Sequence, residues 1–293
     1  MTGKRHFLAK VRGFYACYSL PRLQRVYVQV VSEAAAHIRA AIGADGLLPG
    51  FCPPTGEIHF SEPQRYVGCR LAPTHAAVTE AISGLLSALK AAAPYRNLAG
   101  WIEYHNLYTL YSVWTFGFAS GVRGVLSPYL PPAQIHAPSG FASLTDKDNG
   151  SGYKTRLLWL PPSVLEQMQH YENHLAVVRD EIQEPTPALQ KSCFFLHAEK
   201  RAVEVRPKTL CLHMDPFLPF PVNVHRRFVR SELLERACPP EVVDAWMGHW
   251  HWGEEPWGEF SSFSPIQYRE ALEDYLVPLL RELEFGPLRS GFV

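Results

Sequence analysis

The sequence predicts a mainly α-helical protein with a small antiparallel β-sheet. Apolar residues recur at three- and four-residue spacing over several long segments, which is the pattern of amphipathic helices. Two short β-prone runs flank a turn-rich stretch, and a Pro- and Gly-rich segment separates a short N-terminal part from the rest. With 293 residues and 47% hydrophobic content, the chain is long enough for one large domain and a smaller companion.

The N-terminal part is expected to be small and helical. Over residues 23–42, apolar side chains such as Tyr27, Val30 and Ile38 fall on one face of a helix. Residues 47–73 then break this pattern with repeated Pro and Gly. We therefore expect a helical N-terminal region over 1–70 and a larger domain over 71–293.

The larger domain is expected to begin with two long helices, over 74–93 and 98–119, because both segments are rich in residues that favour helices. Strand signals follow at 141–145 and 155–160, on either side of a run of Asp, Asn and Gly that is typical of a hairpin turn. These two runs predict a small antiparallel sheet inside an α-rich domain.

Proline pairs indicate where two of the later helices begin. A Pro-Pro pair at 161–162 opens one helix, and a second pair at 239–240 opens another that ends at Gly248. Between them a helical pattern begins at Arg226, and a last helix carries Tyr268. Residues 185–221 are irregular and give no assignment.

Composition sets limits on function. The formal net charge is zero and the pI about 7.2, whereas DNA-binding modules are usually basic. Basic residues cluster locally at 225–230, so a basic face can coexist with a neutral total. The N-terminus lacks the apolar core of a signal peptide, and no run of about 18 apolar residues occurs, so we expect a cytoplasmic protein.

Six scattered cysteines form no C-x-x-C pair, which favours reduced core residues over a zinc or redox site. They are Cys17, Cys52, Cys69, Cys193, Cys211 and Cys238.

Residues suited to cutting a phosphodiester through a covalent intermediate occur in order along the larger domain. Guanidinium forks can bond the non-bridging phosphate oxygens in a bidentate manner, and a phenol can attack the phosphorus atom. A lysine can protonate a leaving oxygen, and a histidine can hydrogen-bond the phosphate. The candidate catalytic residues are Arg123, Lys147, Arg226, His249 and Tyr268.

Four segments carry a resemblance to a known family. In chain order they read FASGVRGVLSP, LTDKDNGSGYKTRLLWLP, NVHRRFVRSELLERACPPEVVDAWMGHW and SFSPIQY. They occur in the order seen in tyrosine recombinases, and the chain resembles this phage integrase family over roughly residues 98–285. Residues 1–70 contribute nothing to the match, and we interpret them as a shortened form of the core-binding domain that closes the family's clamp around DNA.

The resemblance implies a site-specific recombinase of mobile genetic elements that integrates or exchanges DNA. Tyr268 would form a 3′-phosphotyrosine intermediate and Lys147 would protonate the leaving 5′-oxygen, with no cofactor, metal or ATP required. Tyr275 is the rival nucleophile and Lys154 the rival acid.

The expected partners follow from the same resemblance. They are double-stranded DNA recombination sites, three further copies of the chain in a homotetramer, and accessory DNA-bending proteins as further candidates. The expected location is the bacterial nucleoid. We expect DNA contacts from Arg227, Arg230, Lys154 and Arg156.

The chain departs from the family pattern in three places. Asn223 stands where the family commonly has a histidine, three residues before Arg226, and is a further candidate catalytic residue. It can donate a hydrogen bond but cannot transfer a proton, and His225 is the alternative. Leu126 stands where an acidic residue often supports the first arginine, so the orientation of that arginine must come from elsewhere. His249 and Tyr268 are 19 positions apart, longer than usual, and the intervening loop is either an ordinary surface loop or a regulatory element.

Two alternative functions remain open. The departures at 223 and 126 suggest a non-catalytic DNA-binding protein that keeps the recombinase fold. A metal hydrolase could be built on His170 and His174, four apart on a helix, or on His249 and His251, although neither pair has a partner at a recognisable spacing.

Overall fold

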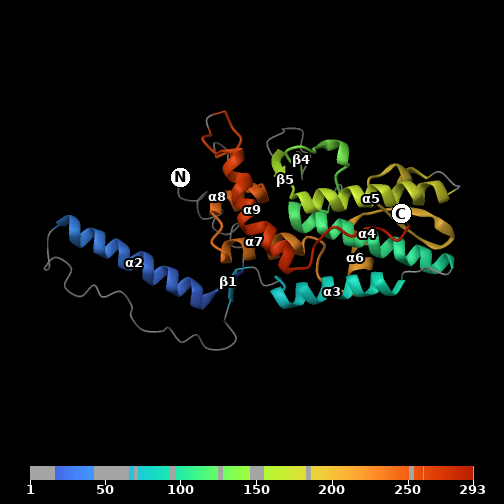
Figure 1. Ribbon diagram of the computed structural model, residues 1–293. Helices are drawn as coiled ribbons and strands as arrows, with labels where there is room; N and C mark the ends of the chain where they lie inside the picture. Colours follow the sequence, from blue (N-terminus) through green and yellow to red (C-terminus); the bar gives the residue numbers. More distant parts are fainter. Residues whose placement is uncertain are drawn as a thin grey trace. The chain divides into compact units, whose positions relative to one another are not determined.

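The computed structural model confirms a mainly helical protein with small antiparallel sheets (Figure 1). It describes residues 17–42, 66–68, 72–92, 97–124, 128–145, 155–182, 186–250, 254–259 and 261–292. The chain divides into two compact units, Met1–Ala72 and Pro73–Val293.

The first unit contains one long helix beside a strand pair. β1 (Cys17–Ser19) pairs antiparallel with β2 (Tyr66–Gly68), so that Tyr18 lies opposite Val67. Helix α2 (Leu20–Ile42) follows β1 and confirms the helix predicted over 23–42. Its exposed apolar side chains recur at helical spacing and include Val26, Tyr27 and Val30.

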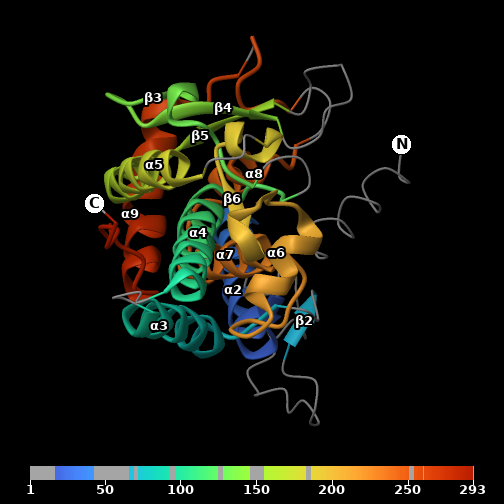
Figure 2. The ribbon, with the colours of Figure 1, turned by 90° about the vertical axis from the view of Figure 1, so that its right-hand side faces the viewer.

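The second unit is built around α4 (Leu98–Ser120), which contacts α3 (His75–Ala92), α5 (Pro162–Glu181) and later helices (Figures 1 and 2). Almost every residue of α4 from Tyr104 onward is buried, so this helix forms the centre of the core. At its start, the side chain of Asn97 accepts a hydrogen bond from the Gly100 N–H at 2.9 Å. The two predicted helices in this region are confirmed.

The predicted hairpin is also confirmed. β4 (Phe141–Thr145) pairs antiparallel with β5 (Thr155–Trp159), and β3 (Ile135–His136) adds a short third strand on the other side of β4. A second antiparallel pair, β6 (Phe194–Leu196) and β7 (Ala202–Glu204), lies in the region that gave no assignment from sequence.

The remaining elements are helical. α7 (Val224–Glu235), α8 (Pro240–Met247) and α9 (Pro265–Glu282) confirm the three predicted C-terminal helices. Proline at the first position of α8 and α9 fits a helix start, since the N–H missing there would have no partner within the helix. The other helical segments are α6 (Pro207–Met214) and short 3₁₀ turns at Pro132–Gln134, Pro187–Gln190 and Ala198–Lys200.

The segment after α9 lies along α4 of the same chain. Three tyrosines of α4 bind its backbone: Tyr111 Oη donates to Gly286 O at 2.6 Å, Tyr108 Oη donates to Leu288 O at 2.5 Å, and Tyr104 Oη accepts from Gly291 N at 2.7 Å. The Phe292 ring stacks on Trp101 with centroids 5.4 Å apart. Residues 286–292 therefore complete the cover of α4.

Two sequence expectations concern environment. Cys193 and Cys238 are buried free thiols and Cys211 is a half-buried one, as expected for reduced core residues, while the side chains of Cys17, Cys52 and Cys69 lie outside the described residues. Within the described part of the chain, no helix combines the length and apolar character that a bilayer crossing needs.

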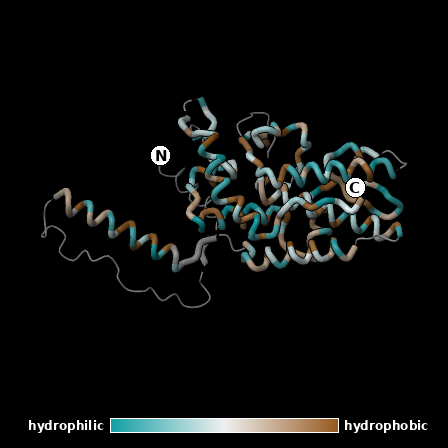
Figure 3. The backbone as a smooth tube through the Cα atoms, viewed as in Figure 1, coloured by the Kyte–Doolittle hydropathy of each residue, from teal (hydrophilic) through white to brown (hydrophobic). Residues whose placement is uncertain are grey.

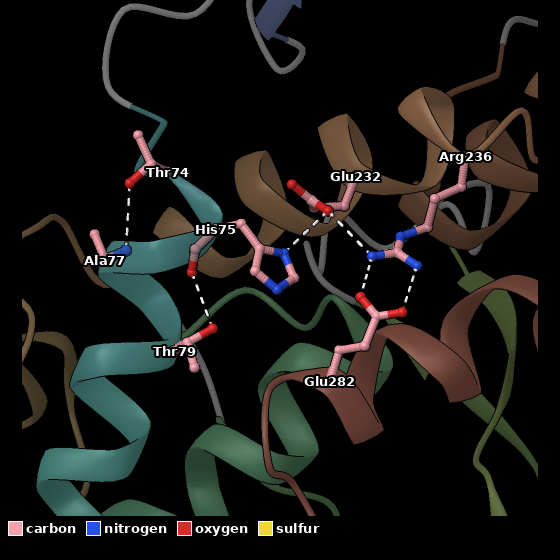
Figure 4. A network of polar contacts seen from close by, with 7 residues as sticks. All are labelled: Thr74, His75, Ala77, Thr79, Glu232, Arg236 and Glu282. Atoms are coloured by element: carbon pink, nitrogen blue, oxygen red, sulfur yellow. Dashed lines mark hydrogen bonds and ion pairs between the residues drawn. The ribbon is translucent and has the colours of Figure 1, made fainter.

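A charged network ties together the start of α3, the end of α7 and the end of α9 (Figure 4). Arg236, directly after α7, donates both terminal nitrogens to the carboxylate of Glu282 on α9, at 2.9 and 2.5 Å. Glu232 of α7 contacts Arg236 at 3.5 Å and His75 Nδ1 of α3 at 3.3 Å. The hydrogen bonds from Arg236 lower the pKa of Glu282 below its ordinary value of 4.5.

We predict that Glu282→Gln lowers the free energy of unfolding at neutral pH by less than about 1 kcal/mol, because the pair is partly exposed and screened. Since the folded-state pKa of Glu282 is depressed, this stabilisation is complete above the ordinary pKa of glutamate and disappears as the pH falls through the folded value. Urea unfolding across the acidic range, started from neutral pH, should show the difference from the parent shrinking. Glu270→Gln, on the exposed face of the same helix, serves as control, and a difference that grows toward acid pH would contradict the prediction.

Candidate functional site

Two helices end side by side, and each ends at a glycine in the left-handed region. Gly121 follows α4 with φ of 60°, and Gly248 follows α8 with φ of 68°. At Gly121 the requirement is also spatial, because a Cβ would lie 2.6 Å from the Trp246 ring. These glycines release the chain from each helix at the point where Arg123 and His249 follow.

Two buried arginines join the helix ends. Arg156 of β5 donates from Nη1 to Ser120 O of α4, at 2.9 Å, and to Trp246 O of α8. Arg226 of α7 donates from Nη1 to Gly121 O and from Nη2 to Met247 O, the latter at 2.8 Å. Carbonyls at a helix C-terminus carry partial negative charge, so these are favourable sites for buried cations.

Two further contacts reinforce the same junction. Trp246 Nε1 donates to Ala119 O of α4 at 3.0 Å. Arg230 of α7 donates to the Asp244 carboxylate of α8 at 2.8 Å, in a salt bridge with both side chains largely buried. The C-terminal parts of α4 and α8 therefore meet the N-terminal part of α7 and strand β5 at one junction.

His249 lies where the charges of this junction meet. Burial, and then the charges of Arg226, Arg230, Arg123 and Arg156 in that order, hold the pKa of His249 well below its ordinary value. The imidazole is therefore neutral at neutral pH and can donate one N–H. Arg123 itself is half-buried and stands three residues after the end of α4.

Tyr268 lies in the first turn of α9 and is fully buried. Its hydroxyl makes a long contact of 3.4 Å with Leu157 O of β5. Burial raises the pKa of this phenol and the charge of Arg156 opposes the shift, so Arg156 acts electrostatically on both Tyr268 and His249. The rival Tyr275 is half-buried, two turns further along α9.

The loop before α9 covers Tyr268. The ring of Trp257 meets the Tyr268 ring edge-on with centroids 5.2 Å apart, and the ring of Phe263 lies 6.0 Å from it. A pocket of about 480 Å³ opens between this loop and the β4–β5 hairpin. Its lining includes Arg156, Ser143 and Thr155 from the hairpin, and Trp257 and Phe263 from the loop.

The structure places the other predicted site residues as follows. Asn223 directly precedes α7, and Arg227 is half-buried on that helix. Arg156 and Arg230, both predicted to contact DNA, are 1% and 3% exposed and hold helix ends together, so direct DNA contact by either stays a prediction. Lys147, Lys154 and Leu126 lie outside the described residues.

His170 and His174, considered as a metal-binding pair, contact different partners. His174 is buried, with Nε2 2.9 Å from Nδ1 of His105 and Nδ1 2.7 Å from Ser290 Oγ. His170 instead lies 3.5 Å from Glu166. Within the described residues, no group of three or more His, Cys, Asp or Glu side chains could hold a metal ion, and His251 lies outside them.

The residues that hold the candidate site together were not predicted from the sequence. Trp246 and Asp244 were expected only as members of a helix, although a tryptophan two residues before the helix-ending Gly248 could have indicated packing at the helix end. From the sequence, Trp257 and Phe263 stood out only because they lie in the unusually long segment between His249 and Tyr268. The buried state of Arg156 could have been inferred, because alternation along β5 places it on the same face as Leu158.

We predict that Gly121→Ala lowers the free energy of unfolding by roughly 2 kcal/mol or more. The left-handed conformation costs an alanine about 1–2 kcal/mol, and the clash with Trp246 adds an overpacking penalty of about 1–3 kcal/mol. Urea denaturation measures the change. Gly286→Ala is the control, because nothing lies within 4 Å of its added Cβ; equal losses at both positions would contradict the prediction.

Comparison with known proteins gives no family assignment. No family model matches this chain, and neither a curated protein nor a solved structure matches it. The function therefore has to be argued from the residues and geometry of the chain itself.

Proposed function

We propose that this chain is a tyrosine-type site-specific DNA recombinase that cleaves and rejoins DNA strands through a 3′-phosphotyrosine intermediate. The observation that supports it most is convergence: Arg226 donates to Gly121 O, two residues before Arg123, and to Met247 O, two residues before His249. The charges of Arg123 and Arg226 also lower the pKa of His249. Arg156 then links this cluster to Tyr268, since its charge acts on both side chains.

The arginine cluster suits a phosphodiester approaching its transition state. Negative charge grows on the non-bridging oxygens as the phosphorus becomes five-coordinate, and fixed cations stabilise that charge without reorganising. A guanidinium is planar and can donate two parallel hydrogen bonds to a phosphate, which fits arginine for this role. A neutral His249 can donate a further hydrogen bond without adding to the repulsion among the arginines.

In the proposed reaction, Tyr268 Oη forms a bond to phosphorus and gives its proton to a water molecule, while the bond from phosphorus to the 5′-oxygen breaks. The 5′-oxygen gains a proton, for which Lys147 is the expected donor. The phosphotyrosine keeps the energy of the broken ester, so a second 5′-hydroxyl can reverse the step and rejoin the strand without ATP. Double-stranded DNA sites and a homotetramer are the partners that the resemblance to tyrosine recombinases implies.

Tyr268 cannot reach a phosphate while Trp257 and Phe263 cover it. Displacement of these two side chains is therefore part of the proposed reaction. The loop that carries them would act as a cover that DNA binding or a neighbouring subunit removes, and this gives the long spacer between His249 and Tyr268 a regulatory role.

Burial of Tyr268 also favours a second candidate, a DNA-binding protein that keeps the fold without catalysis. The two candidates differ in whether a covalent bond forms. A binding protein would bind DNA in a salt-sensitive manner and leave it intact.

We predict that the parent protein forms a covalent adduct with a nicked suicide substrate carrying a junction sequence of its own element, and that Tyr268→Phe forms none. The phenylalanine variant should fold, because the hydroxyl makes only a 3.4 Å contact. Denaturing gels, run without added metal, measure the adduct. Tyr275→Phe is the matched control and should keep it; DNA binding without any adduct would instead support the non-catalytic candidate.

We predict that Trp257→Ala raises the rate of adduct formation several-fold, because it removes the ring that covers Tyr268 edge-on. Single-turnover cleavage of the same substrate provides the measurement. Ile266→Ala, at a side chain 62% exposed on the same helix as Tyr268, should leave the rate unchanged. A slower reaction for Trp257→Ala would show that the loop assists cleavage rather than restraining it.

A further inference from the structure

The backbone around Arg123 is bonded on both sides by residues from the start of α7. His225 Nε2 lies 2.7 Å from Val122 O, which is the shorter of the two contacts that this ring makes with carbonyl oxygens, so we assign its N–H to Nε2. Asn223 Oδ1 accepts from Gly124 N–H at 3.1 Å. The peptide groups before and after Arg123 are thus each held by one side chain.

Asn223 is placed for this contact rather than for its own helix. It occupies the residue before α7, where an asparagine usually caps the helix by accepting from its first turn, yet its side chain makes no such bond. Instead the amide oxygen reaches a residue 99 positions away in sequence. Asn223 therefore forgoes the stabilisation that capping usually gives its helix, and this points to a specific structural role for the bond to Gly124.

His225 is equally fixed. Its ring lies against α4, about 3.7 Å from the position that a Cβ on Gly117 would take, and 5.9 Å from the Phe118 ring. Its Nδ1 lies 3.1 Å from Val222 O, and the side chain is buried. The imidazole therefore cannot swing toward a bound phosphate without leaving its packing.

We propose that Asn223 and His225 are positioning residues that together clamp the backbone on either side of Arg123 and so set the direction of its guanidinium. The proposal rests on the proposed function, in which Arg123 grips the scissile phosphate. Catalytic groups displaced by about 1 Å can lose about a hundredfold in rate, so a half-buried arginine on a short non-helical segment needs such a support. The clamp supplies the orientation that an acidic residue at position 126 would otherwise give.

The same helix start also supplies Arg226. Asn223, His225 and Arg226 lie within one turn, and Arg226 holds Gly121 O while the other two hold Val122 and Gly124. The start of α7 therefore fixes both arginines relative to one another. Asn223 serves this purpose at any pH, because an amide oxygen is always an acceptor, whereas a protonated histidine nitrogen is not.

A double-mutant cycle separates positioning from direct action on the phosphate. Asn223→Ala and His225→Leu are each made with Arg123 intact and in an Arg123→Lys background, and single-turnover cleavage of the suicide substrate is measured. We expect each substitution to lower the cleavage rate about tenfold or more when Arg123 is present. In the Arg123→Lys background we expect less than about threefold, because the guanidinium that the clamp orients is already absent. His225→Gln, which keeps an N–H at the same place, should restore most of the rate. Equal losses in both backgrounds would overturn the clamp.

Hydrogen exchange tests the clamp independently of cleavage. The Gly124 amide should exchange at least about tenfold faster in Asn223→Ala than in the parent, whereas Glu235→Ala, exposed at the far end of α7, should leave it unchanged. Unchanged exchange in Asn223→Ala would overturn the clamp even if the parent cleaves DNA. Absence of any adduct from the parent, with faster exchange in the variant, would instead reject the proposed function and leave the clamp as a structural feature.

Discussion

The candidate site depends on two guanidinium groups that bind backbone carbonyls at the ends of two helices. Arg156 and Arg226 each connect α4 to α8, and each would leave two buried carbonyls without its hydrogen bonds if it were replaced by an apolar residue. A buried carbonyl left without its hydrogen bond typically costs about 1–3 kcal/mol, so the loss of two is a large share of the stability of an ordinary domain. The residues proposed for chemistry are thus carried by the residues that hold the domain together.

This arrangement concentrates positive charge, because Arg156, Arg226 and Arg230 all lie at the same junction. The negative ends of two helices and the Asp244 carboxylate offset part of the charge of the junction. The remainder lowers the pKa of His249, in the same direction as burial, and opposes the rise that burial causes in the pKa of Tyr268. An anion placed beside His249 would relieve the repulsion among the arginines, so binding of a phosphate and stability of the junction should favour one another.

The sequence predicted the long elements well and the short ones poorly. The predicted helices show a repeating apolar pattern, whereas β6 and β7 are three residues each and cannot show one. The eight-residue helix α6, in the same unassigned region, was also missed. The order of the candidate catalytic residues could be read from the chain, but their supports could not. Asn223 and His225 act on peptide groups about a hundred positions away, and such contacts depend on how α7 packs against the end of α4. Arg156 was predictable in part: alternation along β5 indicates that its side chain is buried, but not which carbonyls it binds.

The three tyrosines that line one side of α4 have a consequence for synthesis. Tyr104, Tyr108 and Tyr111 are made early, yet their hydroxyl groups bind backbone between Gly286 and Gly291. During synthesis, nearly two hundred further residues have to be added after α4 before the backbone that binds these hydroxyl groups exists. This side of α4 is therefore completed last, and a nascent chain that stops short of residue 286 leaves the three hydroxyl groups without these backbone partners.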